Sequence, residues 1–336
     1  MNVGGFTSPP FATFNMKALV VASAALMLLA ACAPDGTTAS KALPLALVLT
    51  SNTPNATTLT TATVQGTVYG DSGVSISARG IAYNTSPEPT IANQTAVGGA
   101  GTGTFTSTLT GLTPNTLYYA RAFATNSAGT AYGNQVKVFT AVTDVDGNVY
   151  NTVTIGTQIW MTDDLKVTRY MNGEPLPNVT NDAQWIVSPT GAYSNYNNDA
   201  GTVATYGRLY NFLAATDARR IAPAGWHVPT DAEWTTLFNS LGGFAAAGGK
   251  LKEAGTAHWL APNAGATNSS GFTALPGGSR TVIGTFNGVG IGGCWRSLVT
   301  AAGAHQPCLY YLNADLGYSD TDKDTRVGGH IRCIKD

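Results

Sequence analysis

The chain has little charge and no apolar run long enough to span a membrane. Only 11% of its 336 residues are charged, and the formal net charge is -1. A nearly neutral chain lacks the basic surface that nucleic acid binding requires, so nucleic acid is not an expected partner. The apolar run at residues 18–31 is shorter than the roughly 20 residues of a membrane-spanning helix. Since 43% of the residues are hydrophobic, the chain can build packed cores and is not expected to be disordered.

Cysteine and histidine are also scarce, with 4 residues of each. Their spacing lacks the close pairs that a zinc site needs. No Ser–His–Asp arrangement and no paired carboxylates stand out. We therefore expect a protein that is not an enzyme and that holds no metal or cofactor, with His227 in a core hydrogen-bonding role. The residues concerned are Cys32, Cys294, Cys308 and Cys333, and His227, His258, His305 and His330.

Two turns, at residues 144–148 and 320–324, carry the alternating oxygen ligands of a calcium loop. Calcium loops also need a glycine at the sixth position and a distal bidentate glutamate, which neither turn has. Both are interpreted as solvated turns, and calcium dependence stays open.

The N-terminal region has the order of an exported, cleaved segment: Lys17, the apolar run 18–31, then Cys32 after Leu-Ala-Ala. This order resembles a bacterial lipobox, which implies a diacylglyceryl group on Cys32 and a membrane partner reached through that lipid. Residues 1–31 are the expected leader, with Met16 as the expected start because residues 1–15 carry no charge. Residues 32–42 form a small polar tether. By resemblance to lipoproteins with no Asp after the cysteine, an outer-membrane location is expected; which face of the membrane stays open.

Residues 43–140 contain short alternating segments separated by turn residues, which predicts an antiparallel β-sandwich. Residues 112–118 resemble the corner before the penultimate strand of fibronectin type III domains, where a tyrosine hydroxyl (here Tyr118) bonds to the backbone upstream. We expect a spacer, with ligand binding by this module as the alternative.

Residues 142–336 mix short strands with helices, which predicts an α+β domain. Thr230 and Glu233 form the capping box of a helix that ends at Gly242. Residues 206–215 also have helical spacing. The apolar face of the capped helix is formed by Trp234, Leu237, Phe238 and Leu241.

Several ordered motifs in this second part resemble the Fibrobacter succinogenes major paralogous domain. They lie at residues 144–148, 155–160, 225–234, 249–255, 271–278 and 332–336. That family is similar to C-type-lectin-like folds, including the formylglycine-generating type, and its members are typically surface lipoproteins or secreted proteins. The resemblance implies a C-type-lectin-like domain over residues 142–336.

The chain departs from this family at Ala222, where a Cys-Pro pair is common and would be a natural partner for Cys333. We therefore expect a disulfide between Cys294 and Cys308, although pairing of Cys333 with either stays open. A formylglycine-generating oxidase needs a close pair of redox or copper-binding cysteines. Cys294 and Cys308 lie far apart in the sequence, so this activity is the least favoured reading.

Candidate ligand contacts are aromatic rings beside polar loops, because flat rings with amide neighbours suit sugar faces and loops often carry binding residues. Core packing is the alternative role for these rings, as it is for Trp160, Trp226 and Trp234. We expect a non-catalytic, lipid-anchored envelope protein that presents a lectin-like domain for glycan or surface-ligand binding and adhesion. A structural or protein–protein interaction role without glycan binding is the alternative. The candidate contacts are Trp185, Trp259, Asn263, Asn268, Trp295 and Arg296.

Overall fold

The computed structural model describes residues 47–50, 56–70, 74–298, 306–310, 313, 317–319 and 326–336. The predicted leader, Cys32, the tether and the turn at 320–324 lie outside these residues. The described chain is mostly β-sheet with few helices. Within it, no helix is both long and apolar enough to cross a membrane.

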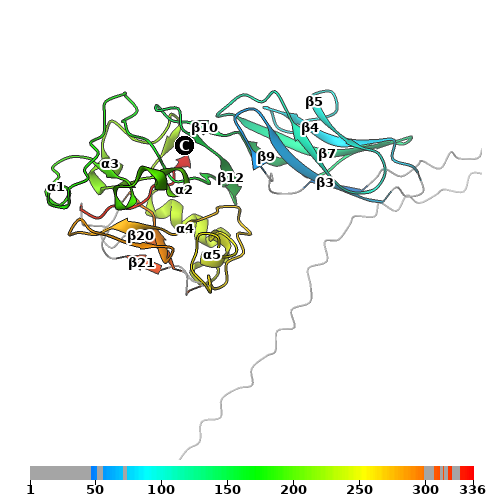
Figure 1. Cartoon of the computed structure of the whole chain (residues 1–336). Helices are drawn as coiled ribbons and strands as arrows, with labels where there is room; N and C mark the ends of the chain where they lie inside the picture. Colours follow the sequence, from blue (N-terminus) through cyan, green and yellow to red (C-terminus); the bar gives the residue numbers. More distant parts are fainter. Residues whose placement is uncertain are drawn as a thin grey trace, which may run out of the picture. The chain divides into compact units, whose positions relative to one another are not determined.

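The first module consists of two antiparallel sheets that enclose one core (Figure 1). Alternation along the strands explains the core: in β7, Tyr118, Ala120 and Ala122 are buried while Tyr119 and Arg121 between them are partly exposed. One sheet contains β1 (Leu47–Thr50), β2 (Ala56–Thr57), β3 (Ala62–Gly70) and β6 (Gly103–Leu109). The other contains β4 (Ala78–Asn84), β5 (Gln94–Gly99), β7 (Leu117–Asn126), β8 (Gly129–Tyr132) and β9 (Val136–Phe139).

The predicted corner of this module is formed by Tyr118. Its hydroxyl accepts a hydrogen bond from the backbone N–H of Thr113 at 3.1 Å. The contact fixes the chain where it enters β7 and satisfies a buried phenol at the same time.

The second module contains two larger sheets and several short helices. In one sheet, β22 lies between β13 and β16, so the last described strand closes onto the beginning of the module. That sheet contains β12 (Thr152–Ile155), β13 (Gln158–Met161), β16 (Trp226–His227) and β22 (Ile334–Lys335). The other contains β17 (Gly277–Arg280), β18 (Phe286–Val289), β19 (Gly292–Cys294), β20 (Gln306–Tyr310) and β21 (Gly317–Ser319).

The remaining elements of this module are short. Two pairs of strands are β10 (Val142–Thr143) with β11 (Val149–Tyr150), and β14 (Tyr193–Ser194) with β15 (Leu209–Tyr210). The helices are α1 (Asp182–Ile186), α2 (Val203–Tyr206), α3 (Phe212–Thr216), α4 (Asp231–Ser240) and α5 (Phe244–Leu251), with 3-10 turns at Tyr196–Asn198 and Ala200–Thr202.

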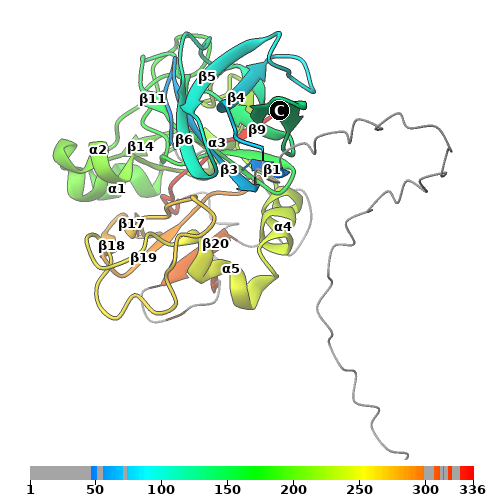
Figure 2. The same ribbon diagram turned by 90° about the vertical axis from the view of Figure 1, so that its right-hand side faces the viewer.

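Helix α4 begins and ends as its sequence predicts. Thr230 Oγ1 accepts from the Glu233 N–H at 3.3 Å, and Glu233 Oε2 accepts from the Thr230 N–H at 2.8 Å, which completes the capping box. Gly242, in the left-handed region at φ 96°, follows the helix. Helix α5 lies beside α4 (Figure 2), with the Phe238 and Phe244 rings 5.3 Å apart.

Candidate binding site

The three tryptophans proposed as sugar contacts are buried, each with an exposed fraction of 1%. The Trp185 indole N–H donates to the Arg326 carbonyl, that of Trp259 to the Ala274 carbonyl at 3.0 Å, and that of Trp295 to Asp164 at 2.8 Å. Rings that are enclosed in this way cannot stack on a ligand from solvent. We therefore correct the expectation: these residues pack the core and fix loops.

The polar residues proposed beside them also bond within the protein. The Asn263 amide nitrogen donates to the Glu253 carbonyl at 2.9 Å, and Asn268 bonds to Thr273 through both its amide oxygen and its amide nitrogen, at 2.8 and 2.9 Å. Arg296 is 1% exposed. Asn263 and Arg296 are buried, and their role as ligand contacts is corrected as well. Asn268 is half-buried, and its role stays a prediction.

The structure instead shows a hollow of about 490 Å³ between β17, β18, β19 and β20, here called the disulfide hollow. Glycines make its floor possible. A Cβ added at Gly278 would lie 2.4 Å from the Asn287 carbonyl, and one at Gly293 would lie 2.6 Å from the Leu275 carbonyl. Only residues without a side chain allow the strands to approach so closely.

The walls of the disulfide hollow combine an aromatic ring and an aliphatic side chain with hydroxyl and amide groups. Tyr310 is 37% exposed and Ile291 is 42% exposed. Ser279 Oγ lies 2.9 Å from the side-chain oxygen of Asn287 on the opposite strand. These groups are neutral and reach solvent.

Arg280, the one charged side chain among the described residues that line this hollow, is turned into the protein. It is fully buried, and its guanidinium carbon lies 4.4 Å from the Trp185 ring centre and 4.8 Å from that of Phe286. Its nitrogen atoms donate to the Gly284 carbonyl at 2.7 Å and to the Asp182 carboxylate at 2.9 Å. Because these partners already saturate much of the guanidinium, the accessible lining formed by the described residues is uncharged.

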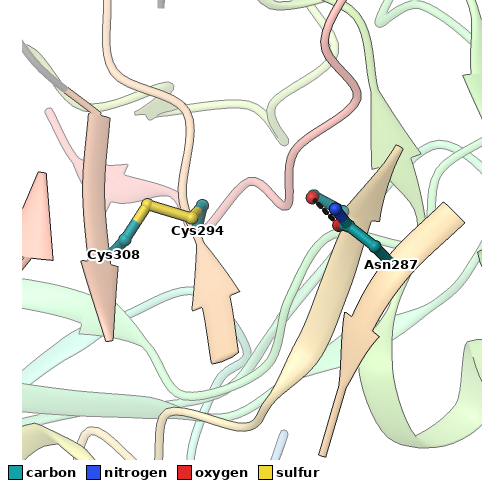
Figure 3. The surroundings of a disulfide bond; sticks show 4 residues. Asn287, Cys294 and Cys308 are labelled. Carbon is teal, nitrogen blue, oxygen red and sulfur yellow. Dashed lines mark hydrogen bonds between the residues drawn. A yellow bond between two sulfur atoms is a disulfide. The ribbon is translucent and has the colours of Figure 1, made fainter. Parts of the chain in front are cut away.

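A disulfide joins Cys294, on the wall of the hollow, to Cys308 (Figure 3). The two residues face each other in the register of β19 and β20, with Cα atoms 4.2 Å apart. The sequence analysis disfavoured thiol chemistry because Cys294 and Cys308 are distant in the sequence. The fold brings them together, so that argument is wrong. Cys333 is a buried free thiol, and burial raises its pKa well above the usual range.

A second hollow, of about 740 Å³, lies beside His227 and is here called the His227 hollow. One ring nitrogen of His227 lies 2.6 Å from Asp336 Oδ1, and the other lies 2.8 Å from Glu233 Oε1. The His227 side chain is 30% exposed, so it is not the core residue that was predicted, but both ring nitrogens form internal hydrogen bonds.

In the turn at 144–148, the carboxylate oxygens of Asp144 accept hydrogen bonds from nearby groups of the protein. Asp144 Oδ1 accepts from the backbone N–H groups of Asp146 and Asn148 at 2.9 and 3.0 Å, and Oδ2 accepts from the Tyr150 hydroxyl at 2.6 Å. Burial is the main cause that raises the pKa of Tyr150, with the Asp144 carboxylate a smaller one. Among the described residues, no three His, Cys, Asp or Glu side chains are placed to hold a metal ion.

Comparisons with known proteins place the second module in a family. Residues 153–335, more than half of the chain, match the model of the Fibrobacter succinogenes major domain. No curated protein was found to match the chain. The sensor domain of the anti-sigma factor RsgI4 of Pseudobacteroides cellulosolvens is similar at 16% identity and a TM-score of 0.22, over 29% of this chain and 96% of that one.

The Yersinia pseudotuberculosis adhesin InvE is similar at 14% identity and a TM-score of 0.21, over 86% of this chain and 70% of that one. TM-scores this low establish no common fold.

Proposed function

This chain belongs to the Fibrobacter succinogenes major domain family, and from that premise we propose that it is a non-catalytic, lipid-anchored envelope protein whose second module binds a neutral glycan. The carrying observation is the disulfide hollow, where the exposed Tyr310 ring lies near hydroxyl and amide groups. The proposal includes a fibronectin type III-like first module, supported by the Tyr118 corner, and a C-type-lectin-like second module.

The chemistry of the disulfide hollow suits a sugar ring. A sugar presents an apolar face of C–H groups and a rim of hydroxyls. The Tyr310 ring and the Ile291 side chain offer apolar contact, while Ser279 and Asn287 offer hydrogen-bond donors and acceptors at the rim. Since the Arg280 guanidinium is buried, the described lining offers no accessible charge that would select an ionic ligand.

A binding role is also favoured over catalysis by the use of His227. Each of its ring nitrogens lies at hydrogen-bond distance from a carboxylate of the chain itself. Neither nitrogen is therefore left to take a proton from a substrate, which a general base must do.

The test is a glycan array probed with the wild-type chain and with Tyr310→Ala. We expect wild-type binding to at least one neutral glycan, and a loss of about fivefold or more in Tyr310→Ala, because a stacked aromatic ring contributes about 1 kcal/mol. Tyr69→Ala is the matched control, since Tyr69 is 60% exposed on β3 of the first module. Absence of binding across a broad array would favour the protein–protein interaction role instead.

The lipid anchor has its own test. A chain that begins at Met16 should incorporate labelled palmitate, and Cys32→Ala should not incorporate the label and should leave the membrane fraction. An equal membrane fraction for Cys32→Ala would contradict the anchor.

One observation favours a second candidate, thiol oxidation of the formylglycine-generating type. Cys294 lines the disulfide hollow and has its disulfide partner beside it. This candidate predicts that the wild-type chain, supplied with dioxygen as oxidant and a thiol as source of two further electrons, converts the cysteine of a peptide substrate to formylglycine with release of hydrogen sulfide and water, and that Cys294→Ser does not. Equal rates for the two chains would remove it.

A further inference from the structure

The His227 hollow is lined by one cationic side chain that pairs with none of the described residues, that of Arg220. Arg220 lines this hollow, is exposed, and has no side-chain hydrogen bond or ion pair with the described part of the chain. Its backbone lies in the left-handed region at φ 58°, which is uncommon for a residue other than Gly, Asn or Asp. Arg220 thus brings a guanidinium that has no partner among the described residues to the lining of this hollow.

The neighbouring Arg219, unlike Arg220, is paired with carboxylates of the protein. The Arg219 guanidinium donates to both carboxylate oxygens of Asp217, at 2.9 and 2.7 Å, and to Glu174 at 2.6 Å. It also lies 3.8 Å from the centre of the Tyr170 ring. Hydrogen bonds from Arg219 lower the pKa of Asp217 to about 2. Asp217, which lines the hollow, is therefore ionised but already neutralised.

The hollow also offers one carboxylate oxygen. Asp336 uses Oδ1 for the contact with His227, and no described residue bonds to its Oδ2. Arg220 and Asp336 thus line the same hollow, and no ion pair joins them.

Between these charged groups the wall is apolar. It is formed by side chains that are buried or half-buried, so a ligand there would lose contact with water. These side chains are Ala215, Ile221, Ala222, Val228 and Leu298.

We propose that the His227 hollow binds a small apolar amino acid in its zwitterionic form, with the ligand carboxylate on Arg220 and the ligand ammonium on Asp336. A guanidinium matches a carboxylate with two parallel N–H donors. A carboxylate oxygen accepts from an ammonium group, and the apolar wall excludes water from the ligand side chain. This site is separate from the disulfide hollow, so either site can fail without the other.

The test uses calorimetric titration of the full chain with three probes: leucine, leucinamide, which lacks the carboxylate, and N-acetylleucine, which lacks the ammonium. We expect leucine to bind at millimolar concentrations or below, and both analogues to bind at least about tenfold more weakly, because each removes a charge-assisted hydrogen bond. Leucinamide or N-acetylleucine binding as tightly as leucine would overturn the proposal. So would an absence of heat for leucine up to about 10 mM.

Two variants test the assigned residues. Arg220→Gln and Asp336→Asn should each weaken leucine binding about tenfold or more while melting temperatures stay close to that of the wild type. Arg121→Gln, in β7 of the first module, is the control and should bind leucine as the wild type does. Unchanged binding in Arg220→Gln would assign the ligand elsewhere and contradict the proposal.

Discussion

At the scale of single residues, Lys252 is a lysine that is fully buried without a carboxylate partner in the described part of the chain. Its ammonium donates to the carbonyls of Ala264, Tyr310 and Asn313, at 2.8, 3.1 and 2.7 Å. It also lies 5.4 Å from the centre of the Trp259 ring. Since Tyr310 lines the disulfide hollow, the hydrogen bond from Lys252 to the Tyr310 carbonyl fixes the backbone of one of its walls.

Lys252 gives stability a defined dependence on pH. Burial lowers its pKa from 10.5 to about 8. Between these values Lys252 is protonated in the unfolded chain and neutral in the folded chain, so its contribution to the free energy of unfolding should rise with pH, by up to about 2 kcal/mol between pH 7.5 and 9.5. The buried Cys333 thiol, whose pKa is raised in the folded chain, acts in the opposite direction, so the Lys252 effect is the difference between the wild type and Lys252→Met. Urea unfolding at both pH values measures this. Lys252→Met should lack the rise, and an equal rise in that variant would refute the assignment.

Asp164 is the shared hydrogen-bond acceptor of two buried side chains, Trp295 and Arg332. Its Oδ1 accepts from Trp295 Nε1 and from Arg332 Nε, both at 2.8 Å, and all three residues are buried. Asp164→Ala would leave the Arg332 guanidinium without its carboxylate in the interior, so we expect a loss of about 3–5 kcal/mol in the free energy of unfolding.

The adjacent Asp163 is the control, because its side chain is 30% exposed and lies 3.9 Å from Lys166, with hydrogen bonds from the Asn151 N–H at 3.0 Å and the Thr162 hydroxyl at 3.4 Å. Asp163→Ala should cost about 1–2 kcal/mol, because it removes a partly exposed hydrogen bond and not the partner of a buried charge. Similar losses for Asp163→Ala and Asp164→Ala in urea unfolding would contradict the account.

These interior contacts explain why the ligand contacts could not be read from the sequence. A tryptophan next to polar residues has the same local sequence whether its ring faces solvent or a loop carbonyl. For Trp259 and Trp295 the deciding partners, Ala274 and Asp164, are distant in the chain. Tyr310 was overlooked because it directly follows Cys308 and Leu309, which are buried, and nothing in the local sequence shows that its own ring is exposed.

At the scale of elements, helix α4 was predictable because its capping residues are local in the sequence. Thr230→Ala removes an acceptor for the Glu233 N–H and should lower the free energy of unfolding by about 1 kcal/mol. Thr235→Ala, in the exposed middle of the same helix, should be neutral or slightly stabilising because alanine has the higher helix propensity. Urea unfolding of both variants checks this, and equal losses would contradict the capping role.

The helix predicted at residues 206–215 does not form, and the reason is partly tertiary. Gly207 adopts φ 70° and ends α2. Leu209 and Tyr210 then pair with β14, and α3 begins only after Asn211, whose side chain accepts from the Ala214 N–H. Spacing alone could not reveal the pairing with β14.

The disulfide between β19 and β20 should stabilise the sheet that surrounds the disulfide hollow. It closes a loop with a sequence separation of 14, for which chain entropy gives about 3 kcal/mol. The double variant Cys294→Ser with Cys308→Ser should lose about that much stability in urea unfolding. Dithiothreitol should lower the wild type to the level of the double variant. A wild type that is insensitive to dithiothreitol would contradict this role.

At the scale of the whole molecule, the two modules and the family of the second could be predicted because turn residues and ordered motifs recur along the chain. The contacts between segments that are distant in the sequence could not be predicted in this way. The Trp226 indole N–H donates to the Asn115 side chain at 3.1 Å, and its ring lies 5.5 Å from that of Phe139. Side chains of the first module thus join a core of the second.

The central claim is that a neutral glycan occupies the disulfide hollow against Tyr310. The most direct measurement is 19F NMR of the chain labelled with fluorotyrosine, with the Tyr310 signal identified by its loss in Tyr310→Phe. Addition of a glycan selected on the array should shift the Tyr310 signal and leave that of Tyr69 unchanged. A glycan that binds and leaves the Tyr310 signal in place would contradict the account.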